Sequence, residues 1–367
     1  MLAMTLMVRD EADVIRAMLE HSFAQGIDLI IATDNGSIDG TTEILEEYAR
    51  NGRLILRHDP VHMKQQHTTV SQMARDASTE YHADWVINAD ADEFWQPAVG
   101  GRTLGQIFAE LPTSYRAVLV PVYDMTGPPA ISGTGLQRLL YRDLRPVDDI
   151  RKLGLHGHAT SDTVHVGDPD VEVAQGNHLV NFSPEGTPPR ELQVEVQHFP
   201  WRSWEQFDRK VSASGRAYES NRLLRPSANH HGMKDYSRWK LGSLFSAYIA
   251  RHPTPEQLEA GIAAGHFVRD DRVALSAVSP VPDVPIDVAT IETNAHLGRI
   301  IIDFETRLAN ATQDTYDRMR SLEEQLEDMQ FQRDQALAEL HRQRSRRVVR
   351  ILDRLGRMRP GHADPEH

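Results

Sequence analysis

Residues 85–94 read WVINADADEF, an apolar run that leads directly into three acidic residues. The run at 85–88 has the length and composition of a buried strand. Asp90, Asp92 and Glu93 follow it and repel one another, while large apolar residues on both flanks keep much of the water away. A divalent cation would relieve that repulsion. The pattern predicts a strand that ends at a metal site, although a lone Asp-x-Asp is also found in solvated loops.

Strands and helices alternate on both sides of this run. Short apolar stretches predict further strands at residues 2–8, 28–33, 54–57 and 117–123. Apolar residues at helical spacing predict helices at residues 11–25, 41–50, 67–81 and 104–111. The alternation predicts an α/β fold with a mostly parallel sheet and helices on both faces. Ligands of such sheets bind beyond the carboxyl ends of the strands, which is where the site is expected.

A second motif follows the strand predicted at 28–33. Residues 34–41 read DNGSIDGT, in which Asn35-Gly36 suits a tight turn and Asp39 or Thr41 suits the cap of the next helix. Asp34 is either part of this turn or a carboxylate that accepts a hydrogen bond from a ligand, and both readings remain open. An EF-hand is excluded, because Gly36 would stand at a ligand position.

Composition limits the chemistry further. The chain has 367 residues, a net charge of −13 and no cysteine. Disulfides and thiolate zinc sites are therefore excluded, and a metal held by oxygen or imidazole is expected to be Mg²⁺ or Mn²⁺. The negative charge argues against a nucleic-acid partner. Without a basic stretch before the first apolar run, or an apolar run near 20 residues, the expectation is a soluble cytoplasmic protein.

Three motifs in this order resemble family 2 glycosyltransferases of the GT-A type: residues 7–12 (MVRDEA), 34–41 and 90–94 (DADEF). The resemblance covers residues 1–125. It extends less specifically to 175–178 (QGNH) and 198–207 (HFPWRSWEQF), which are similar to later motifs of one bacterial branch. It implies a nucleotide-sugar-binding GT-A sheet and metal-dependent transfer of a sugar, expected to be UDP-linked, to an acceptor hydroxyl.

The resemblance also implies roles for individual residues. Asp34 would contact the nucleobase, and the loop around Arg9 and Glu11 would line the nucleotide pocket. Arg75 is a candidate for contact with the base or the phosphates.

The metal and the reaction centre are assigned in the same way. Asp90 would lie near the ribose and the metal, and Asp92 would bind the metal. His198 stands where members of this fold often bring a late histidine to the metal, although an ordinary hydrogen-bonded histidine is an even alternative.

The general base is not apparent in the sequence. Many inverting members carry a Glu-Asp pair after the Asp-x-Asp, and residues 125–200 contain none. His178 is the candidate base, with Asp149 and His156 as rivals. Inversion is therefore an expectation carried over from the family.

Other functions agree less well with these motifs. A nucleotidyltransferase and a Rossmann dehydrogenase both need a glycine-rich loop after the first strand, and residues 7–12 contain no glycine. An inactive scaffold that dimerises through the tail agrees with the missing base, but not with intact Asp34, Asp90 and Asp92.

The pattern of the remaining chain predicts three parts. These are an acceptor-side half of the catalytic domain at 126–300, an amphipathic helix or short coiled coil at 305–345, and a basic flexible tail at 346–367. Residues 203–224 predict a helix, residues 226–300 are weakly patterned, and 280–285 resembles a linker. A heptad repeat predicts a possible homodimer through Thr315, Met319, Leu322, Leu326, Met329, Arg333, Ala336 and Leu340. Residues 342–359 hold eight arginines, which suggests peripheral contact with the inner face of a membrane.

Overall fold

The computed structural model describes residues 1–60, 66–153, 155, 157–220, 231–278 and 280–356. The chain divides into two compact units, Met1–Asp303 and Phe304–His367. The two halves expected at 1–125 and 126–300 thus share one unit. Their strands are interleaved, since β10 (Asp162–Val166) lies in the same sheet as the first strands of the chain.

The first sheet has six strands in the order β3-β2-β1-β4-β10-β6. Four of them are parallel and confirm the predicted strands: β1 (Leu2–Val8), β2 (Leu29–Asp34), β3 (Leu54–His58) and β4 (Trp85–Ala89). β10 is antiparallel to both β4 and β6 (Ala117–Val120). β1 and β4 are paired from Leu2↔Trp85 to Leu6↔Ala89, so the residues that follow both strands emerge at one edge.

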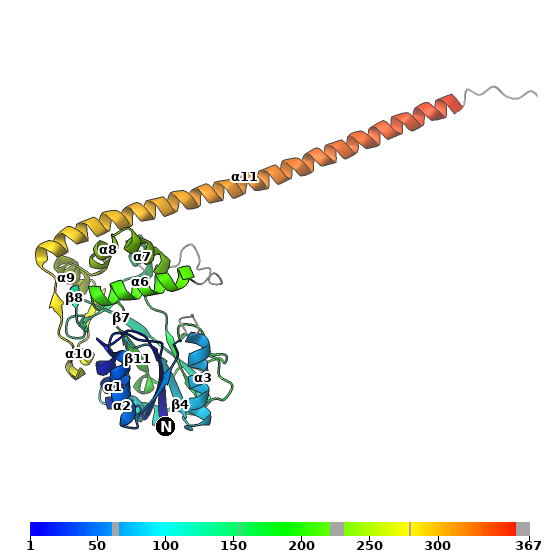
Figure 1. The fold of residues 1–367 in the computed structure, drawn as a ribbon. Coiled ribbons are helices and arrows are strands. Elements are labelled where there is room, and N and C mark those ends of the chain that lie inside the picture. Colours follow the sequence, from blue (N-terminus) through cyan, green and yellow to red (C-terminus); the bar gives the residue numbers. More distant parts are fainter. Residues whose placement is uncertain (61–65, 154, 156, 221–230, 279, 357–367) are drawn as a thin grey trace, which may run out of the picture. The chain divides into compact units, whose positions relative to one another are not determined.

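Helices cover both faces of this sheet, as predicted. One core cluster joins Met4, Leu6 and Ile30 to side chains of α1 (Ile15–Ala24), α2 (Thr41–Arg50) and α4 (Leu104–Glu110). The other cluster joins Ala3, Ile31 and Val86 to α3 (Gln66–Thr79). The two clusters use alternate residues of the same strands, as the two-residue period of a strand requires. Figure 1 shows α1 and α2 on one side of the strands and α3 on the other.

A second sheet lies next to the first and was only partly predicted. Its order is β12-β9-β7-β11-β5. The single strand predicted at 117–123 is two strands, β6 and β7 (Val122–Thr126), which separate at Pro121 and belong to different sheets. The third acid after β4, Glu93, already begins the strand β5 (Glu93–Pro97). The other members are β9 (Tyr141–Asp143), β11 (Val194–His198) and β12 (Phe267–Arg269).

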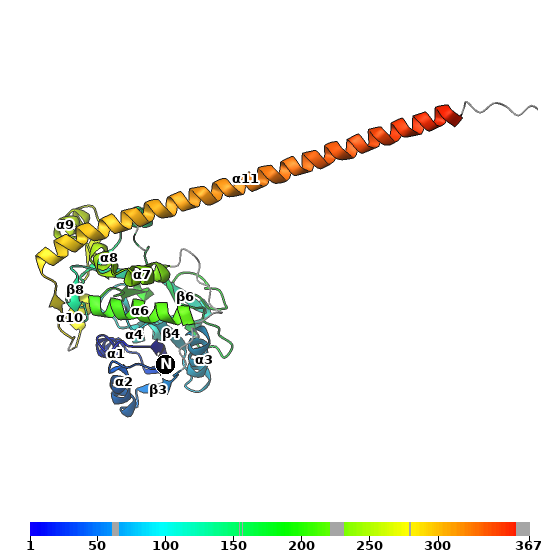
Figure 2. The same ribbon diagram turned by 45° about the horizontal axis from the view of Figure 1, so that its top comes forward.

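Helices make up most of the region that follows β11. The predicted helix is α6 (Trp204–Ser220), and its expected continuation lies outside the described residues. The weakly patterned region contains α7 (His231–Lys240), α8 (Leu244–Arg251), α9 (Pro255–Ala263) and α10 (Arg272–Ser276). These helices are short, so few turns display a repeating apolar face. A core cluster with Phe207, Tyr236 and Tyr248 joins α6, α7 and α8, which Figure 2 shows together.

Smaller elements complete this unit. α5 (Val147–Lys152) follows β9, and short 3₁₀ turns lie at Thr113–Tyr115 and Arg190–Leu192. The segment expected as a linker ends in β13 (Val284–Pro285), which pairs with β8 (Ala130–Ser132).

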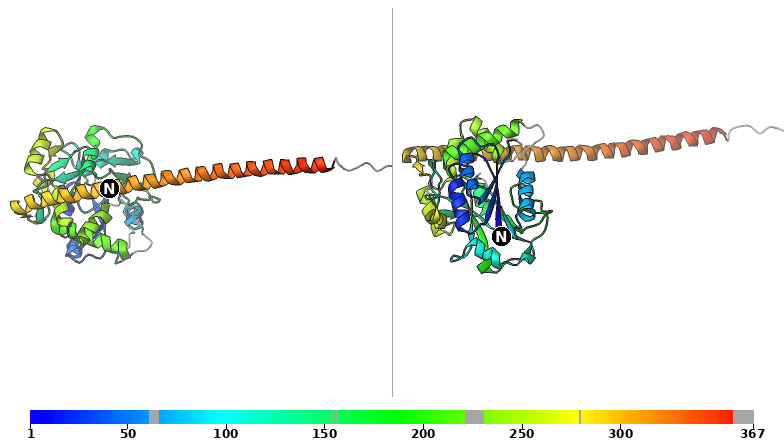
Figure 3. Two further views of the ribbon diagram at one scale, coloured as in Figure 1. Left: turned by 90° about the horizontal axis from the view of Figure 1, so that it is seen from above. Right: turned by 60° about the horizontal axis from the view of Figure 1, so that its bottom comes forward.

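The C-terminal helix, α11 (Val288–Gly356), is unbroken (Figure 3). It confirms the predicted helix but begins earlier, and it continues through the first part of the segment expected to be flexible. Ala295 and Ile302 are buried. The described side chains from Met319 to Leu340 are exposed, including the apolar seam residues Leu322, Leu326 and Met329. Among the described residues no helix is both long and apolar enough to span a bilayer.

Candidate active site

The carboxyl ends of β1 and β4 and one face of α6 surround a cavity of about 300 Å³. Arg9 and Glu11, which follow β1, line it together with Asp90 and Asp92, which follow β4. The structure therefore brings together these four residues that the sequence proposed for the site. Parallel pairing of β1 with β4 is the reason, because it places both loops at the same edge of the sheet. The opposite wall is made by Gln206, Arg209, Lys210, Ala213, Ser214 and Ala217 of α6.

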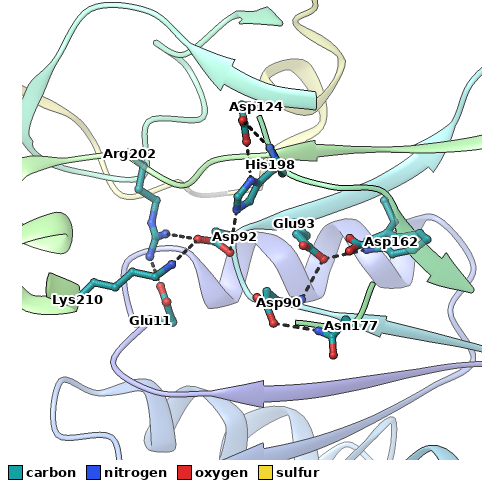
Figure 4. A network of polar contacts seen from close by, with 12 residues as sticks. Glu11, Asp90, Asp92, Glu93, Asp124, Asp162, Asn177, His198, Arg202 and Lys210 are labelled. Carbon is teal, nitrogen blue, oxygen red and sulfur yellow. Dashed lines mark hydrogen bonds and ion pairs between the residues drawn. The ribbon is translucent and has the colours of Figure 1, made fainter. Parts of the chain in front are cut away.

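Asp92 lies among three basic side chains (Figure 4). Its carboxylate is 3.1 Å from Lys210 Nζ, 3.6 Å from Arg202 Nη1 and 3.8 Å from His198 Nε2. Burial opposes ionisation, but Lys210, His198 in its protonated form and Arg202 together hold the pKa of Asp92 well below its usual range. Segment 198–210 therefore supplies counter-charges for Asp92 from within the protein.

Asp90 has the opposite electrostatic character, although it is only two residues away. Burial and the nearby charge of Asp92 raise the pKa of Asp90 to about 6. Its Oδ1 accepts hydrogen bonds from Gln66 Nε2 at 3.2 Å and from Asn177 Nδ2 at 3.1 Å. The Asp90 backbone N–H donates to Glu93 Oε2, which fixes the turn between β4 and β5. Asp90 thus lines the cavity as a hydrogen-bonded side chain with a raised pKa, whereas Asp92 stays ionised.

His198 is oriented by a second carboxylate. It ends β11 and is paired with Asp124 of the parallel strand β7. His198 Nδ1 lies 2.8 Å from Asp124 Oδ1, so Nδ1–H donates there and Nε2 points toward Asp92 (Figure 4). Burial lowers the pKa of His198, but the hydrogen bond to Asp124 and the charge of Asp92 raise it above the ordinary value. A carboxylate behind the second ring nitrogen is the usual support of a metal-binding histidine.

Asp92 Oδ1 and His198 Nε2 lie 3.8 Å apart, and these two atoms would be the protein's ligands to a cation at this site. Among the described residues no group of three or more histidine, aspartate or glutamate side chains is placed to hold a metal ion. This donor set does not fit a permanent, fully protein-bound metal. It fits Mg²⁺ or Mn²⁺ that completes its coordination with substrate phosphates and water.

Arg202 ties the two cavity loops together. It is completely buried, with Nε donating to Asp13 Oδ2 at 2.7 Å and Nη2 donating to Glu11. Its Nη1 faces Asp92 and has no hydrogen-bond partner within the described part of the chain. One side chain from the segment before α6 thereby holds the loop after β1 next to the loop after β4.

Asp34 serves the turn that follows β2. Its Oδ1 accepts from the backbone N–H of Ser37 at 3.1 Å, and its Oδ2 accepts from Thr42 Oγ1 at 2.7 Å. The carboxylate is buried and does not line the cavity. Asp39 accepts from Thr41 and from the backbone N–H of Ala12, which connects this turn to the loop after β1. A contact between Asp34 and the nucleobase stays a prediction.

Arg75, His178 and Asp149 are not among the residues that line the cavity. Arg75 donates from Nε to the carbonyl of Val171 at 2.8 Å and does not line the cavity. His178 Nδ1 is 2.9 Å from the buried Asp162, a hydrogen bond that raises the pKa of His178. Asp149 is half-buried in the first turn of α5, and His156 lies outside the described residues.

No pattern in the sequence pointed to three residues of the site: Asp124, Arg202 and Lys210. Arg202 lies within the motif at 198–207, and Lys210 lies three residues beyond it on α6. Asp124 has no local signal, because its partner His198 is 74 residues away.

Residues 3–124 match the family model of "Glycosyltransferase family 92". The match supports a glycosyltransferase. It covers the first third of the chain and names a different family from family 2, which the motifs resemble. No curated protein matches the chain.

Solved structures that a structural comparison matches to this chain include TarS from S. aureus. TarS 1–349 is 11% identical over 84% of this chain and 91% of that one, with a TM-score of 0.34. The same fragment in complex with UDP-GlcNAc is 10% identical over 84% and 92%, also with a TM-score of 0.34. This chain spans 43% of the length of the longer TarS structure, at a TM-score of 0.31.

Proposed function

We propose that this protein transfers a sugar from a nucleotide-diphosphate donor, expected to be UDP-linked, to an acceptor hydroxyl. The observation that carries the proposal is the cavity between β1, β4 and α6. There Asp90 and Asp92, which lie within the segment that matches a glycosyltransferase family, line the cavity, and Asp92 faces the ammonium of Lys210 on α6. A mixed set of acids and cations suits a ligand that carries both hydroxyls and phosphates.

Each group of residues around the cavity is proposed to contact a different part of the donor. Arg9 and Glu11 line the part of the cavity after β1 and are proposed to contact the nucleotide. Asp90, with its Oδ1 already held by Gln66 and Asn177, is proposed to accept from a ribose hydroxyl. Asp34 and Arg75 keep their proposed contacts with the nucleobase and the phosphates, which require donor binding to extend beyond the cavity.

Asp92 and His198 are the residues proposed to hold Mg²⁺ or Mn²⁺. When bound there with the donor, such a cation supplies Lewis-acid stabilisation of the leaving diphosphate. Asp124 fixes the ring of His198 so that Nε2, and not Nδ1, is presented to the site.

The proposed reaction is a single displacement. The acceptor oxygen forms a bond to the anomeric carbon while the bond from that carbon to the β-phosphate oxygen breaks, and its electron pair leaves with the diphosphate. His178, oriented by Asp162, is proposed to take the proton of the acceptor hydroxyl. A single displacement inverts the anomeric centre.

Two proposals concern the C-terminal part. The exposed heptad seam on α11 suits a homodimer. The arginines of 342–359 are proposed to contact a membrane surface from its cytoplasmic side.

A donor assay tests the proposed function. The full chain is incubated with UDP-sugars, starting with UDP-GlcNAc, and UDP release is measured with Mn²⁺ and with excess EDTA. Release that requires Mn²⁺ and is absent in Asp92→Asn supports the proposal. The inactive scaffold predicts no release in any condition, and a nucleotidyltransferase would release pyrophosphate from a nucleoside triphosphate and a sugar phosphate instead.

A further inference from the structure

Helix α6 brings two polar side chains into the cavity to which the proposed function gives no ligand, Gln206 and Lys210. Lys210 Nζ lies 3.1 Å from Asp92 Oδ2, yet 52% of the Lys210 side chain is exposed. Gln206, one turn earlier on the same face, is 3% exposed and lines the same cavity. Neither its Oε1 nor its Nε2 has a hydrogen-bond partner among the described residues. A buried amide without partners at a cavity wall indicates a bound ligand or water there.

The two oxygens of Asp92 face different partners. Oδ1 is the oxygen nearest His198 Nε2, at 3.8 Å, whereas Oδ2 is nearest Lys210 and Arg202. A divalent cation between Asp92 and His198 would therefore share one carboxylate with two positively charged side chains. Like charges at this spacing weaken the binding of the cation until a negatively charged ligand enters. A diphosphate supplies that negative charge.

A lysine side chain is suited to contact such a ligand as it enters the cavity. Its ammonium has three donors on a flexible stem, so it can contact a phosphate oxygen while staying close to Asp92. The half-exposed side chain has room to move, in contrast to Arg202, which is fully buried and held by Glu11 and Asp13.

We infer that Lys210 is a further residue of the donor site: its ammonium binds the diphosphate of the donor and makes binding of the divalent cation depend on that diphosphate. Gln206 donates to the same ligand from the adjacent turn. This inference rests on the proposed function and deepens it, because it names a second source of positive charge for the leaving group.

The test compares Lys210→Gln with the parent in the full chain. Lys240→Gln is the matched control, since Lys240 is an exposed lysine on α7 that forms an ion pair with Glu219 on α6. Calorimetry measures binding of UDP, uridine and pyrophosphate with Mn²⁺ present, and electron paramagnetic resonance measures binding of Mn²⁺ alone. Thermal unfolding checks that each variant is folded.

The inference predicts two changes of opposite sign in Lys210→Gln. UDP should bind about ten- to a hundredfold more weakly, the range for a hydrogen bond to a charged group, while uridine binding is unchanged. Mn²⁺ alone should bind more tightly than to the parent. Lys210→Arg should keep most of the UDP affinity.

Unchanged UDP affinity in Lys210→Gln, with a parent that binds UDP, would overturn this inference and leave the proposed function intact. A parent that binds pyrophosphate through Lys210 but no UDP would refute the nucleotide donor and keep the phosphate site. A parent that binds neither would overturn both.

Discussion

Lys210 Nζ and Asp92 Oδ2 lie 3.1 Å apart, so helix α6 and the loop after β4 are joined across the cavity by an ion pair between residues 118 positions apart. Asp92 is buried, whereas half of the Lys210 side chain is exposed. The pair compensates the charge of Asp92 without closing the cavity, because the ammonium approaches from the open side.

Asp92→Asn should lose both activity and stability. UDP release should fall by roughly a hundredfold or more, because each 1.36 kcal/mol of lost stabilisation is about tenfold in rate. The free energy of unfolding, measured in urea without metal, should fall by about 2 kcal/mol, since Lys210 and the buried Arg202 lose their shared anion. Glu43→Gln, an exposed site on α2, serves as the control. Equal or higher stability would mean that repulsion among the acids outweighs the ion pairs.

Asp34→Ala should destabilise the protein by about 1–3 kcal/mol, because Ser37 and Thr42 lose a buried acceptor. If Asp34 also contacts the nucleobase, UDP affinity should fall by a further 1.5–3 kcal/mol, roughly the range of a hydrogen bond to a charged group. Asp39→Ala disturbs the same turn without removing that carboxylate. An equal loss of UDP affinity in both variants would return Asp34 to a purely structural role.

Asp124→Asn should impair the proposed cation site without touching its ligands. An amide can no longer hold the Nδ1–H tautomer of His198 as a carboxylate does, so about a ten- to hundredfold loss in activity or Mn²⁺ affinity is expected. Titration with Mn²⁺ should recover part of the activity. If activity falls by the same factor at every Mn²⁺ concentration, Asp124 acts elsewhere.

Deleting residues 305–367 should leave the first unit folded, because the unit boundary falls at Asp303. The truncated chain should lose the exposed seam that includes Leu322, Leu326 and Met329. Light scattering should then show a dimer for the full chain and a monomer after truncation. A full chain that is already monomeric would rule out association through α11.

His21 should make the protein sensitive to mild acid. It is buried on α1, its Nε2 lies 2.8 Å from the carbonyl of Trp95, and burial lowers its pKa to about 4. The unfolded chain takes up this proton near pH 6.5, so the stability due to neutral His21 is complete above that pH and is lost as the pH falls toward 4. The loss is about 3 kcal/mol.

His21→Gln keeps an N–H donor in reach of Trp95 but cannot titrate. Urea unfolding of this variant at several pH values should show a smaller loss between pH 6.5 and pH 4 than the parent. Identical pH profiles would exclude His21 as the source, leaving His165 and His252, whose pKa values burial also lowers.

The sequence by itself determined the parallel strands and the edge at which the acids gather. An apolar run followed by polar residues is a local pattern, and parallel pairing of β1 with β4 then places Arg9, Glu11, Asp90 and Asp92 together. The tertiary structure alone decided which charges compensate Asp92. Lys210 and Arg202 reach it through the packing of α6, and His198 reaches it through the pairing of β11 with β7. Such contacts depend on how distant segments pack, and no local periodicity encodes them. For the same reason Pro121 reads as the interior of one strand, although the chain passes there from one sheet to the other.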